Sequence, residues 1–280
     1  MKKVLSFDIG GTNTRLALVN ENLDVEQIEV IPTVKFDNGA FLASIEKLIT
    51  RFDLTDVIAF GCGIPGVCNR ETGFIYDLPN VHVKNIPFGE YIKNKYKKRI
   101  FVRNDAEVAC LAEAYNGAGK DHEKVFFITI STGLGGALVI NNENQDYITE
   151  IGHTAYQYKN KVLEYESLAS GSGIVNLASI NGLHIKDSKE FFNLVSKQNE
   201  KALYVYGEWQ NILQDFITMI QDSYEPDIIC VTGGVMKAKK IFFASLIARN
   251  PHSNIVECEH GEEAGLIGAA IYAFKNMKYI

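Results

Sequence analysis

The sequence predicts an α/β protein built from two related halves. A strand, a glycine-rich turn and a second strand occur in residues 4–19, VLSFDIGGTNTRLALV, and the same succession recurs in residues 125–140, VFFITISTGLGGALVI. Segments with the helical spacing of apolar residues separate and follow these two units. The recurrence of one β-turn-β unit far along the chain indicates two half-domains of common design.

The first half is expected to begin with a hairpin and to continue in a β-α-β order. A helix is predicted where apolar residues are spaced i, i+3, i+4, i+7, and a short strand after it is predicted to end in a rigid loop, Gly61 to Gly66. The expected elements are strands at 4–9, 14–19, near 25–34, 57–60 and 100–102, and a helix at 40–52.

A capped helix is expected directly after the strand at 100–102. Asn104 can cap a helix that starts near Asp105, because Glu107 follows three residues on, as in a capping box. Gly117 and Gly119 are placed to end this helix.

The second half combines its own hairpin with longer helices. A long helix is expected at 204–222, a buried strand at 228–231 that ends in Thr232-Gly233-Gly234-Val235, and a helix between Glu262 and Phe274. We therefore expect a smaller domain of residues 1–107 with the C-terminal helix 264–280, and a larger domain of residues 108–263.

Composition is that of an ordinary globular protein. The 280 residues are 46% hydrophobic and 22% charged, with a formal net charge of −6 and no basic block that would favour nucleic acid. No apolar run reaches the ~20 residues of a membrane helix, and no signal peptide is evident, so a cytoplasmic protein is expected. The five cysteines lack Cys-x-x-Cys spacing, which favours reduced thiols.

Three glycine-rich turns each follow a strand: Gly10-Gly11, Gly133 to Gly136, and Gly233-Gly234. In α/β folds ligands collect where strand ends and such turns converge, and their backbone N–H groups suit phosphate oxygens. Neither of the first two turns ends in Gly-Lys-Ser/Thr, which excludes a Walker A motif. The three together favour nucleotide binding over the alternative of plain hairpin turns. Asp8 can hold Mg²⁺ beside them, directly or through water.

Six motifs occur in the order seen in the ROK (repressor, open reading frame, kinase) family of sugar kinases, which the chain resembles from residue 4 to about 272. They are Asp8-Ile9-Gly10-Gly11-Thr12-Asn13, Gly63-Ile64-Pro65-Gly66, Asn104-Asp105-Ala106, Gly133-Leu134-Gly135-Gly136, Glu150-Ile151-Gly152-His153 and Gly233-Gly234-Val235. The resemblance implies an actin-like ATPase (ribonuclease H-like) fold of two domains with an interdomain cleft. It also implies ATP-dependent phosphorylation of a hexose or N-acetylhexosamine, usually at the 6-hydroxyl.

The resemblance also implies roles for individual residues. Asp105 matches the catalytic base. Glu166 stands at the expected distance before Ser170-Gly171, with Glu164 as a close competitor. The positions that match sugar contacts are Gly63, Asn104, Asp105, Glu150, His153 and Glu166. Those that match ATP contacts are Asp8, Gly10, Gly11, Thr12, Asn13, Thr132, Gly133, Gly135, Gly233 and Gly234.

Elementary chemistry is consistent with these roles. Phosphoryl transfer needs a group that accepts the hydroxyl proton, and a helix start keeps a carboxylate such as Asp105 ionised. The alternative for Asp105 is a first-turn acid that only stabilises the helix. Glu150 can pair with two sugar hydroxyls and the His153 imidazole with another, whereas the alternative for His153 is a buried, hydrogen-bonded histidine.

The chain departs from the family where many members carry a Cys-x-Cys-Gly-x-x-Gly-Cys loop that holds zinc. Residues 154–166 read TAYQYKNKVLEYE and contain no cysteine. Because tetrahedral zinc needs four ligands, normally Cys or His, we expect no zinc here and expect Tyr156, Tyr158 and Tyr165 to pack the loop instead. The orientation of His153, which zinc would otherwise fix, is left open.

The functional expectation is a sugar kinase that uses ATP and Mg²⁺. Glucose, N-acetylmannosamine, fructose and allose all fit the family pattern, and a homodimer is the oligomeric state that the analogy suggests. The alternatives are a sugar-responsive transcriptional regulator and a non-catalytic sugar-binding relative. We expect no DNA-reading segment, because the first phosphate-loop strand begins at Val4 and the chain is acidic.

Overall fold

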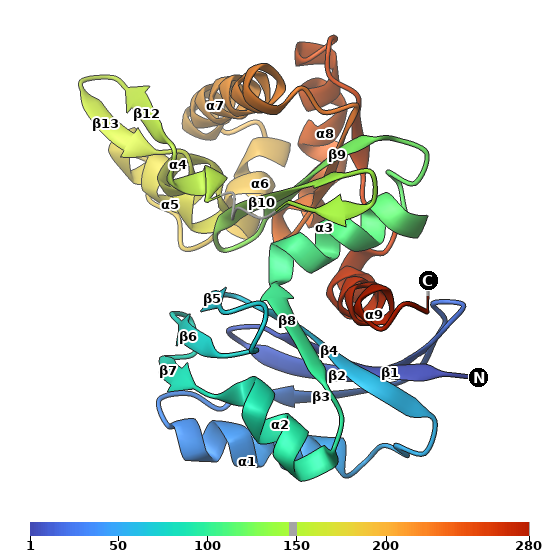
Figure 1. Ribbon diagram of the computed structural model, residues 1–280. Helices are drawn as coiled ribbons and strands as arrows, with labels where there is room; N and C mark the ends of the chain where they lie inside the picture. The colour runs from blue at the N-terminus through green and yellow to red at the C-terminus, as the bar shows by residue number, and fades with distance from the viewer. Residues whose placement is uncertain (146–149, 280) are drawn as a thin grey trace. The chain divides into compact units, whose positions relative to one another are not determined.

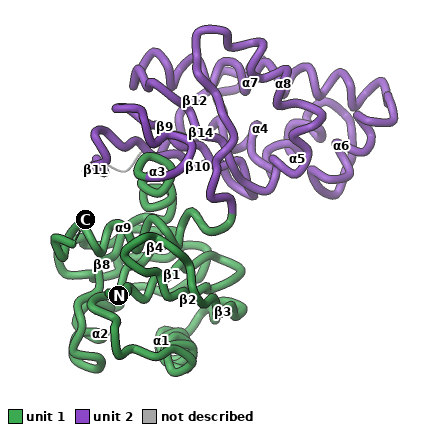
Figure 2. The backbone as a smooth tube through the Cα atoms, turned by 90° about the vertical axis from the view of Figure 1, so that its right-hand side faces the viewer, with its two compact units in different colours: residues 1–115, 262–280 green, residues 116–261 purple. Residues whose placement is uncertain are grey.

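The computed structural model describes residues 1–145 and 150–279, which form two compact units. One unit contains residues 1–115 and 262–280, and the other contains residues 116–261 (Figure 2). The sequence predicts two domains with boundaries at 107/108 and 263/264. These domain boundaries stay a prediction, and the units are described by their own bounds.

The first unit is built on a five-stranded sheet of order β3-β2-β1-β4-β8 (Figure 1). Its strands are β1 (Lys3–Ile9), β2 (Asn13–Asn20), β3 (Val25–Pro32), β4 (Val57–Ile64) and β8 (Ile100–Asn104). The hairpin strands pair antiparallel, with Asp8 opposite Arg15, whereas β4 and β8 add in parallel. The carboxyl ends of β1, β4 and β8 therefore meet at one edge of the sheet.

Helices cover both faces of this sheet (Figure 1). The helices α1 (Asn38–Ile49) and α2 (Phe88–Tyr96) pack on one face, and α9 (Ala264–Asn276) packs on the other through Leu266, Ala270 and Phe274. A small sheet of β5 (Val67–Cys68), β6 (Ile75–Leu78) and β7 (Val83–Ile86) lies beside α2, and α3 (Asp105–Asn116) follows β8.

The second unit repeats the same strand topology. Its sheet has the order β11-β10-β9-β14-β15, in which the hairpin of β9 and β10 is antiparallel and β14 and β15 add in parallel. The two related half-domains inferred from the sequence are thus visible as two sheets of one design. The strands are β9 (Lys124–Ile130), β10 (Leu134–Ile140), β11 (Glu143–Asn144), β14 (Ile228–Thr232) and β15 (Ile255–Glu257).

Helices and a hairpin complete the second unit. The apolar faces of α5, α6, α7 and α8 contribute to one core, in which Trp209 of α7 is fully buried with its ring against Phe192 of α6 and Phe242 of α8. The elements are α4 (Glu166–Ala169), α5 (Gly171–Ile180), α6 (Ser188–Ser196), α7 (Glu200–Tyr224), α8 (Lys239–Arg249), the strands β12 (Ala155–Tyr158) and β13 (Lys161–Glu164), and the 3₁₀ turns η1 (Ile151–His153) and η2 (Gly234–Ala238). A further 3₁₀ turn, η3 (Gly261–Glu263), spans the boundary between the two units in the chain.

The predicted loop from Gly61 to Gly66 is wrong in its first part, because β4 continues to Ile64. Gly61 is buried in the strand against the backbone of Ala269 in α9, where any Cβ would collide with the Ala269 carbonyl. Glycine is therefore used here for the close packing of a helix on the sheet and not to break the strand. The local pattern could not distinguish these two uses.

Candidate active site

The turn between β1 and β2 is held by a hydrogen bond of its own and by Thr33, the residue after β3. Gly10 N–H donates to the Asn13 carbonyl at 2.9 Å, Thr33 N–H donates to the Thr12 carbonyl at 2.9 Å, and the Thr33 hydroxyl donates to the Gly10 carbonyl at 2.7 Å. Thr12 and Asn13 are exposed. The backbone of the predicted first phosphate loop is thus ordered by Thr33, while its polar side chains are accessible to a ligand.

Asp8 lies at the sheet edge against the start of α9. A Cβ built on Gly265, the second residue of α9, would lie 3.0 Å from the Asp8 carboxyl carbon. Burial raises the pKa of Asp8, and the facing Arg15 partly opposes this rise. One carboxylate of this kind fits a Mg²⁺ ion that takes its other ligands from water and nucleotide phosphates.

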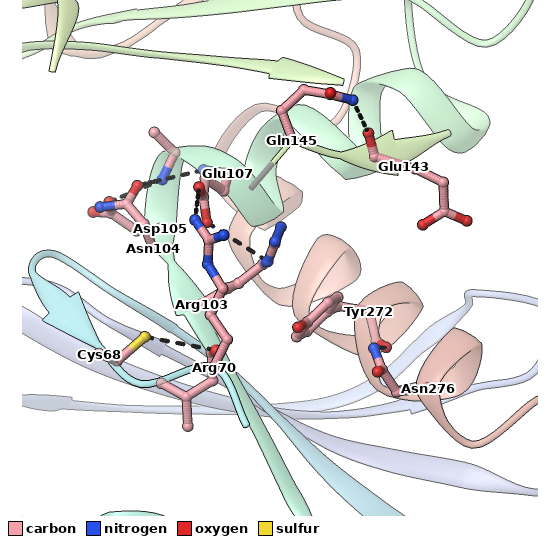
Figure 3. A network of polar contacts seen from close by, with 12 residues as sticks. Cys68, Arg70, Arg103, Asn104, Asp105, Glu107, Glu143, Gln145, Tyr272 and Asn276 are labelled. Carbon is pink, nitrogen blue, oxygen red and sulfur yellow. Dashed lines mark hydrogen bonds and ion pairs between the residues drawn. The ribbon is translucent and has the colours of Figure 1, made fainter. Parts of the chain in front are cut away.

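The ends of β4 and β8 bring three predicted site residues next to Asp8. Gly63 is the register partner of Asp8, and a Cβ on Gly63 would lie 3.5 Å from the Cα of Asp105. The Asn104 side chain accepts from Ala106 N–H at 2.9 Å and, more weakly, from Glu107 N–H at 3.4 Å, so it caps α3 as predicted (Figure 3). Asp8, Gly63, Asn104 and Asp105 therefore share one sheet edge, where α/β folds bind ligands.

A buried ionic network secures the first turn of α3. Glu107 binds Arg70 at 2.8 Å and approaches Arg103 at 3.6 Å, and the Arg103 guanidinium lies 5.0 Å from the Tyr272 ring centroid (Figure 3). Burial raises the pKa of Glu107, and the two arginines oppose this rise. Sequence reasoning identified Glu107 only as part of a capping box and missed both arginines. Arg70 is distant in the sequence, and Arg103 lies in β8, outside the helix in which i, i+4 pairs are expected.

The second and third glycine turns meet in the second unit. The Ser131 hydroxyl accepts from Gly234 N–H at 3.2 Å, and the Ser131 carbonyl accepts from Gly171 N–H at 2.7 Å. Gly233 has a φ of +106° and lies against the Ile130 carbonyl, so only glycine fits there without strain. Thr132 is exposed between these contacts. Ser131, absent from the predicted site, thus joins the two turns.

Glu166 is positioned against the second turn. Its Oε2 accepts from Leu134 N–H at 2.8 Å, and a Cβ on Gly133 would lie 2.6 Å from the same oxygen. Gly152 packs on the Leu134 carbonyl, so η1 with His153 adjoins the same residues. The second unit therefore gathers Thr132, Gly133 and Gly135 with Glu150, His153 and Glu166, and the glycines at 233 and 234 adjoin them through Ser131.

His153 is flanked by two carboxylates. Its Nδ1 lies 3.0 Å from Glu164 Oε2 and its Nε2 lies 3.9 Å from Glu150 Oε2. The hydrogen bond to Glu164, with smaller contributions from Glu166 and Glu150, raises the pKa of His153. The imidazole is about half exposed, so the alternative of a buried histidine does not apply.

The segment that follows His153 folds as the hairpin of β12 and β13. Tyr158 and Tyr165 are buried and the Tyr156 ring packs on Tyr165, so the predicted packing of the loop by these tyrosines is confirmed. Within residues 1–145 and 150–279, no group of three or more His, Cys, Asp or Glu side chains is arranged to hold a metal ion. No helix in the same ranges is long and apolar enough to cross a membrane.

Comparison with known proteins places the chain in a family. The model of the ROK family matches residues 4–276. The chain is 27% identical over 266 residues to a glucokinase of Halalkalibacterium halodurans, which covers 84% of this chain and 81% of the relative. It is 26% identical over 295 residues to an N-acetyl-D-glucosamine kinase of Haemophilus influenzae, covering 94% and 97%.

A solved structure matches the fold at lower identity. The ROK family glucokinase of Streptomyces griseus, in complex with glucose and AMPPNP, superposes with a TM-score of 0.75 at 22% identity and covers 96% of this chain and 98% of its own. The predicted fold class, the actin-like ATPase fold of ROK sugar kinases, is confirmed. With the match over nearly its whole length, this chain belongs to the ROK family.

Proposed function

We propose that this protein is an ATP-dependent kinase that phosphorylates a hexose or N-acetylhexosamine, at the 6-hydroxyl. The observation that carries the proposal is the placement of Asp105 as the first residue of α3, beside Gly63 and Asp8 at the carboxyl ends of the parallel strands β1, β4 and β8. The kinase names of the curated relatives, and the ATP analogue bound by the Streptomyces griseus structure, support the same reaction class.

Asp105 acts as the general base in this proposal. Its carboxylate accepts the proton of the sugar hydroxyl while the oxygen attacks the γ-phosphorus of ATP. One O–P bond forms, the bond to the β-phosphate oxygen breaks, and ADP leaves. The α3 N-terminus favours the ionised carboxylate. The Asn104 cap fixes the direction of that first turn.

The other residues bind and orient the substrates. Asp8 would hold Mg²⁺, which neutralises phosphate charge when bound. The turns that start at Gly10, Thr132 and Gly233 offer backbone N–H groups to phosphate oxygens and to the adenosine. Glu150, His153 and Glu166 offer hydrogen-bond partners for sugar hydroxyls, and the first-unit partners are Gly63 and Asn104.

A coupled ADP-release assay over a panel of hexoses and N-acetylhexosamines tests the proposal. Asp105→Asn should still bind the preferred sugar but lose turnover by about 10²–10⁴-fold, the range for a general base. Asp121→Asn, an exposed Asp-to-Asn change outside the site, is the matched control and should keep the wild-type rate. A wild-type rate in Asp105→Asn would refute the base. Tight sugar binding without turnover on any sugar would favour the non-catalytic alternative.

A further inference from the structure

The imidazole of His153 is fixed by a partner that no family motif assigned. Glu164 Oε2 lies 3.0 Å from Nδ1, whereas Glu150 Oε2 lies 3.9 Å from Nε2. Nδ1 therefore has a hydrogen bond within the chain, whereas within residues 1–145 and 150–279 the ionic neighbour of Nε2 is the more distant Glu150 carboxylate. This asymmetry gives the two nitrogens different roles.

We propose that Glu164 is a positioning residue that orients His153 for sugar binding, with Nδ1–H donated to Glu164 and Nε2 presented to a sugar hydroxyl. The proposal rests on the proposed function, because it assigns a substrate contact to Nε2. It also gives different roles to Glu164 and Glu166, the two candidates for the sugar-contacting carboxylate. Glu164 acts through the histidine, and Glu166, which accepts from Leu134 N–H, remains the candidate for direct sugar contact.

The register of the β12–β13 hairpin brings Glu164 close to His153. In the register of β12 and β13, Glu164 is opposite Ala155, two residues after the histidine. The Tyr165 N–H donates to the Thr154 carbonyl at 3.1 Å, which extends the pairing by one step toward His153. Backbone pairing between the two strands therefore holds the residues next to His153 close to Glu164.

Tyrosines anchor this hairpin on α7. The Tyr156 hydroxyl donates to Asp215 at 2.6 Å and the Tyr158 hydroxyl donates to Glu208 at 2.9 Å. The Tyr165 ring packs against Phe216 in a tilted arrangement, at a centroid distance of 5.0 Å. A segment held at three points along one helix can keep Glu164 in place without a metal.

The main effect of the His153–Glu164 pair is to orient the imidazole ring, and its contribution to folding stability is small. Both side chains are about half exposed, and exposed ion pairs contribute little to folding. A carboxylate that accepts one imidazole N–H selects the tautomer and the ring direction, as outer partners of ligand histidines do in other sites. The hydrogen bond to Glu164 and the negative charges of Glu166, Glu164 and Glu150 raise the pKa of the ring.

Two substitutions of Glu164 separate orientation from charge. Glu164→Ala removes the acceptor, and we expect the KM for the sugar to rise about 10-fold while the KM for ATP and kcat change little. Glu164→Gln keeps an amide oxygen that can accept Nδ1–H and should recover part of the loss. Val162→Ala, an exposed change on the same face of β13, is the control and should match wild type.

Nitrogen-15 NMR of the histidine rings gives a readout that does not depend on turnover. The His153 signal, identified by its loss in His153→Gln, should show the Nδ1–H tautomer in wild type and a tautomer mixture with a lower pKa in Glu164→Ala. An unchanged tautomer and an unchanged sugar KM in Glu164→Ala would overturn the proposal. Absence of turnover on every sugar would instead reject the kinase function, and the NMR result would still decide whether Glu164 orients the ring.

Discussion

The Asp8 carboxylate and the Gly265 backbone are in direct contact, although they come from opposite ends of the chain. A Cβ on Gly265 would lie 3.0 Å from the carboxyl carbon and 3.1 Å from Oδ1 of Asp8. The carboxylate thus faces the first turn of α9, where backbone N–H groups carry a partial positive charge. The contact with α9 therefore helps to position Asp8, the predicted magnesium ligand.

Gly265→Ala should separate activity from stability. Alanine improves helix propensity by about 1 kcal/mol, yet its methyl group forces the Asp8 side chain to shift. A misplacement on this scale lowers kcat by up to about 10²-fold while the melting temperature changes little. Steady-state kinetics and thermal denaturation measure the two effects. Gly207→Ala in α7, where a Cβ meets nothing within 4 Å, should raise stability and keep activity. Wild-type kcat in Gly265→Ala would contradict the role of this contact.

Gly233→Ala should destabilise the second unit, whereas Gly234→Ala should not. The positive φ of Gly233 and its contact with the Ile130 carbonyl strain any side chain, which costs about 1–3 kcal/mol. A Cβ on Gly234 meets nothing within 4 Å. Urea denaturation of both variants at one pH measures the difference, and equal stabilities would show that the turn relaxes freely.

Glu166→Gln should weaken sugar binding while the second turn stays intact. The glutamine oxygen can still accept from Leu134 N–H, so folding and the KM for ATP should hardly change. Loss of the charge should raise the KM for the sugar roughly 10–100-fold, the range for a charge-assisted hydrogen bond of about 1.5–3 kcal/mol. Kinetics with each substrate varied in turn decide the matter. A larger effect on ATP than on sugar would place Glu166 on the nucleotide side.

The His153–Glu164 pair should make stability depend on pH in a defined direction. The pKa of His153 in the folded chain is raised above its ordinary value of 6.5. The contribution is therefore fully present below pH 6.5 and is lost as the pH rises through the folded-state pKa. Because the pair is half exposed, it amounts to about 0.2–1 kcal/mol. Urea denaturation should find Glu164→Gln less stable than wild type at pH 5.5 and equal to it at pH 9. A constant difference across this range would argue against the pair.

The sequence by itself determined the elements whose causes are local. The glycine turns after β1 and β9, the Asn104 cap and each copy of the β-turn-β unit depend on residues that are close together in the sequence. The ordered motifs were sufficient for the family, and the tyrosines after His153 were sufficient to expect a packed loop in place of a zinc loop.

Only the tertiary structure decided the contacts between distant segments. It extended β4 through Gly61, placed Gly265 against Asp8, and joined Arg70 to Glu107. It also separated Glu164 from Glu166, because a strand and a helix start direct two neighbouring glutamates to different partners. Such contacts depend on how strands pair and how helices pack. Residue type and spacing along the chain do not predict them, because the partners are far apart in the sequence.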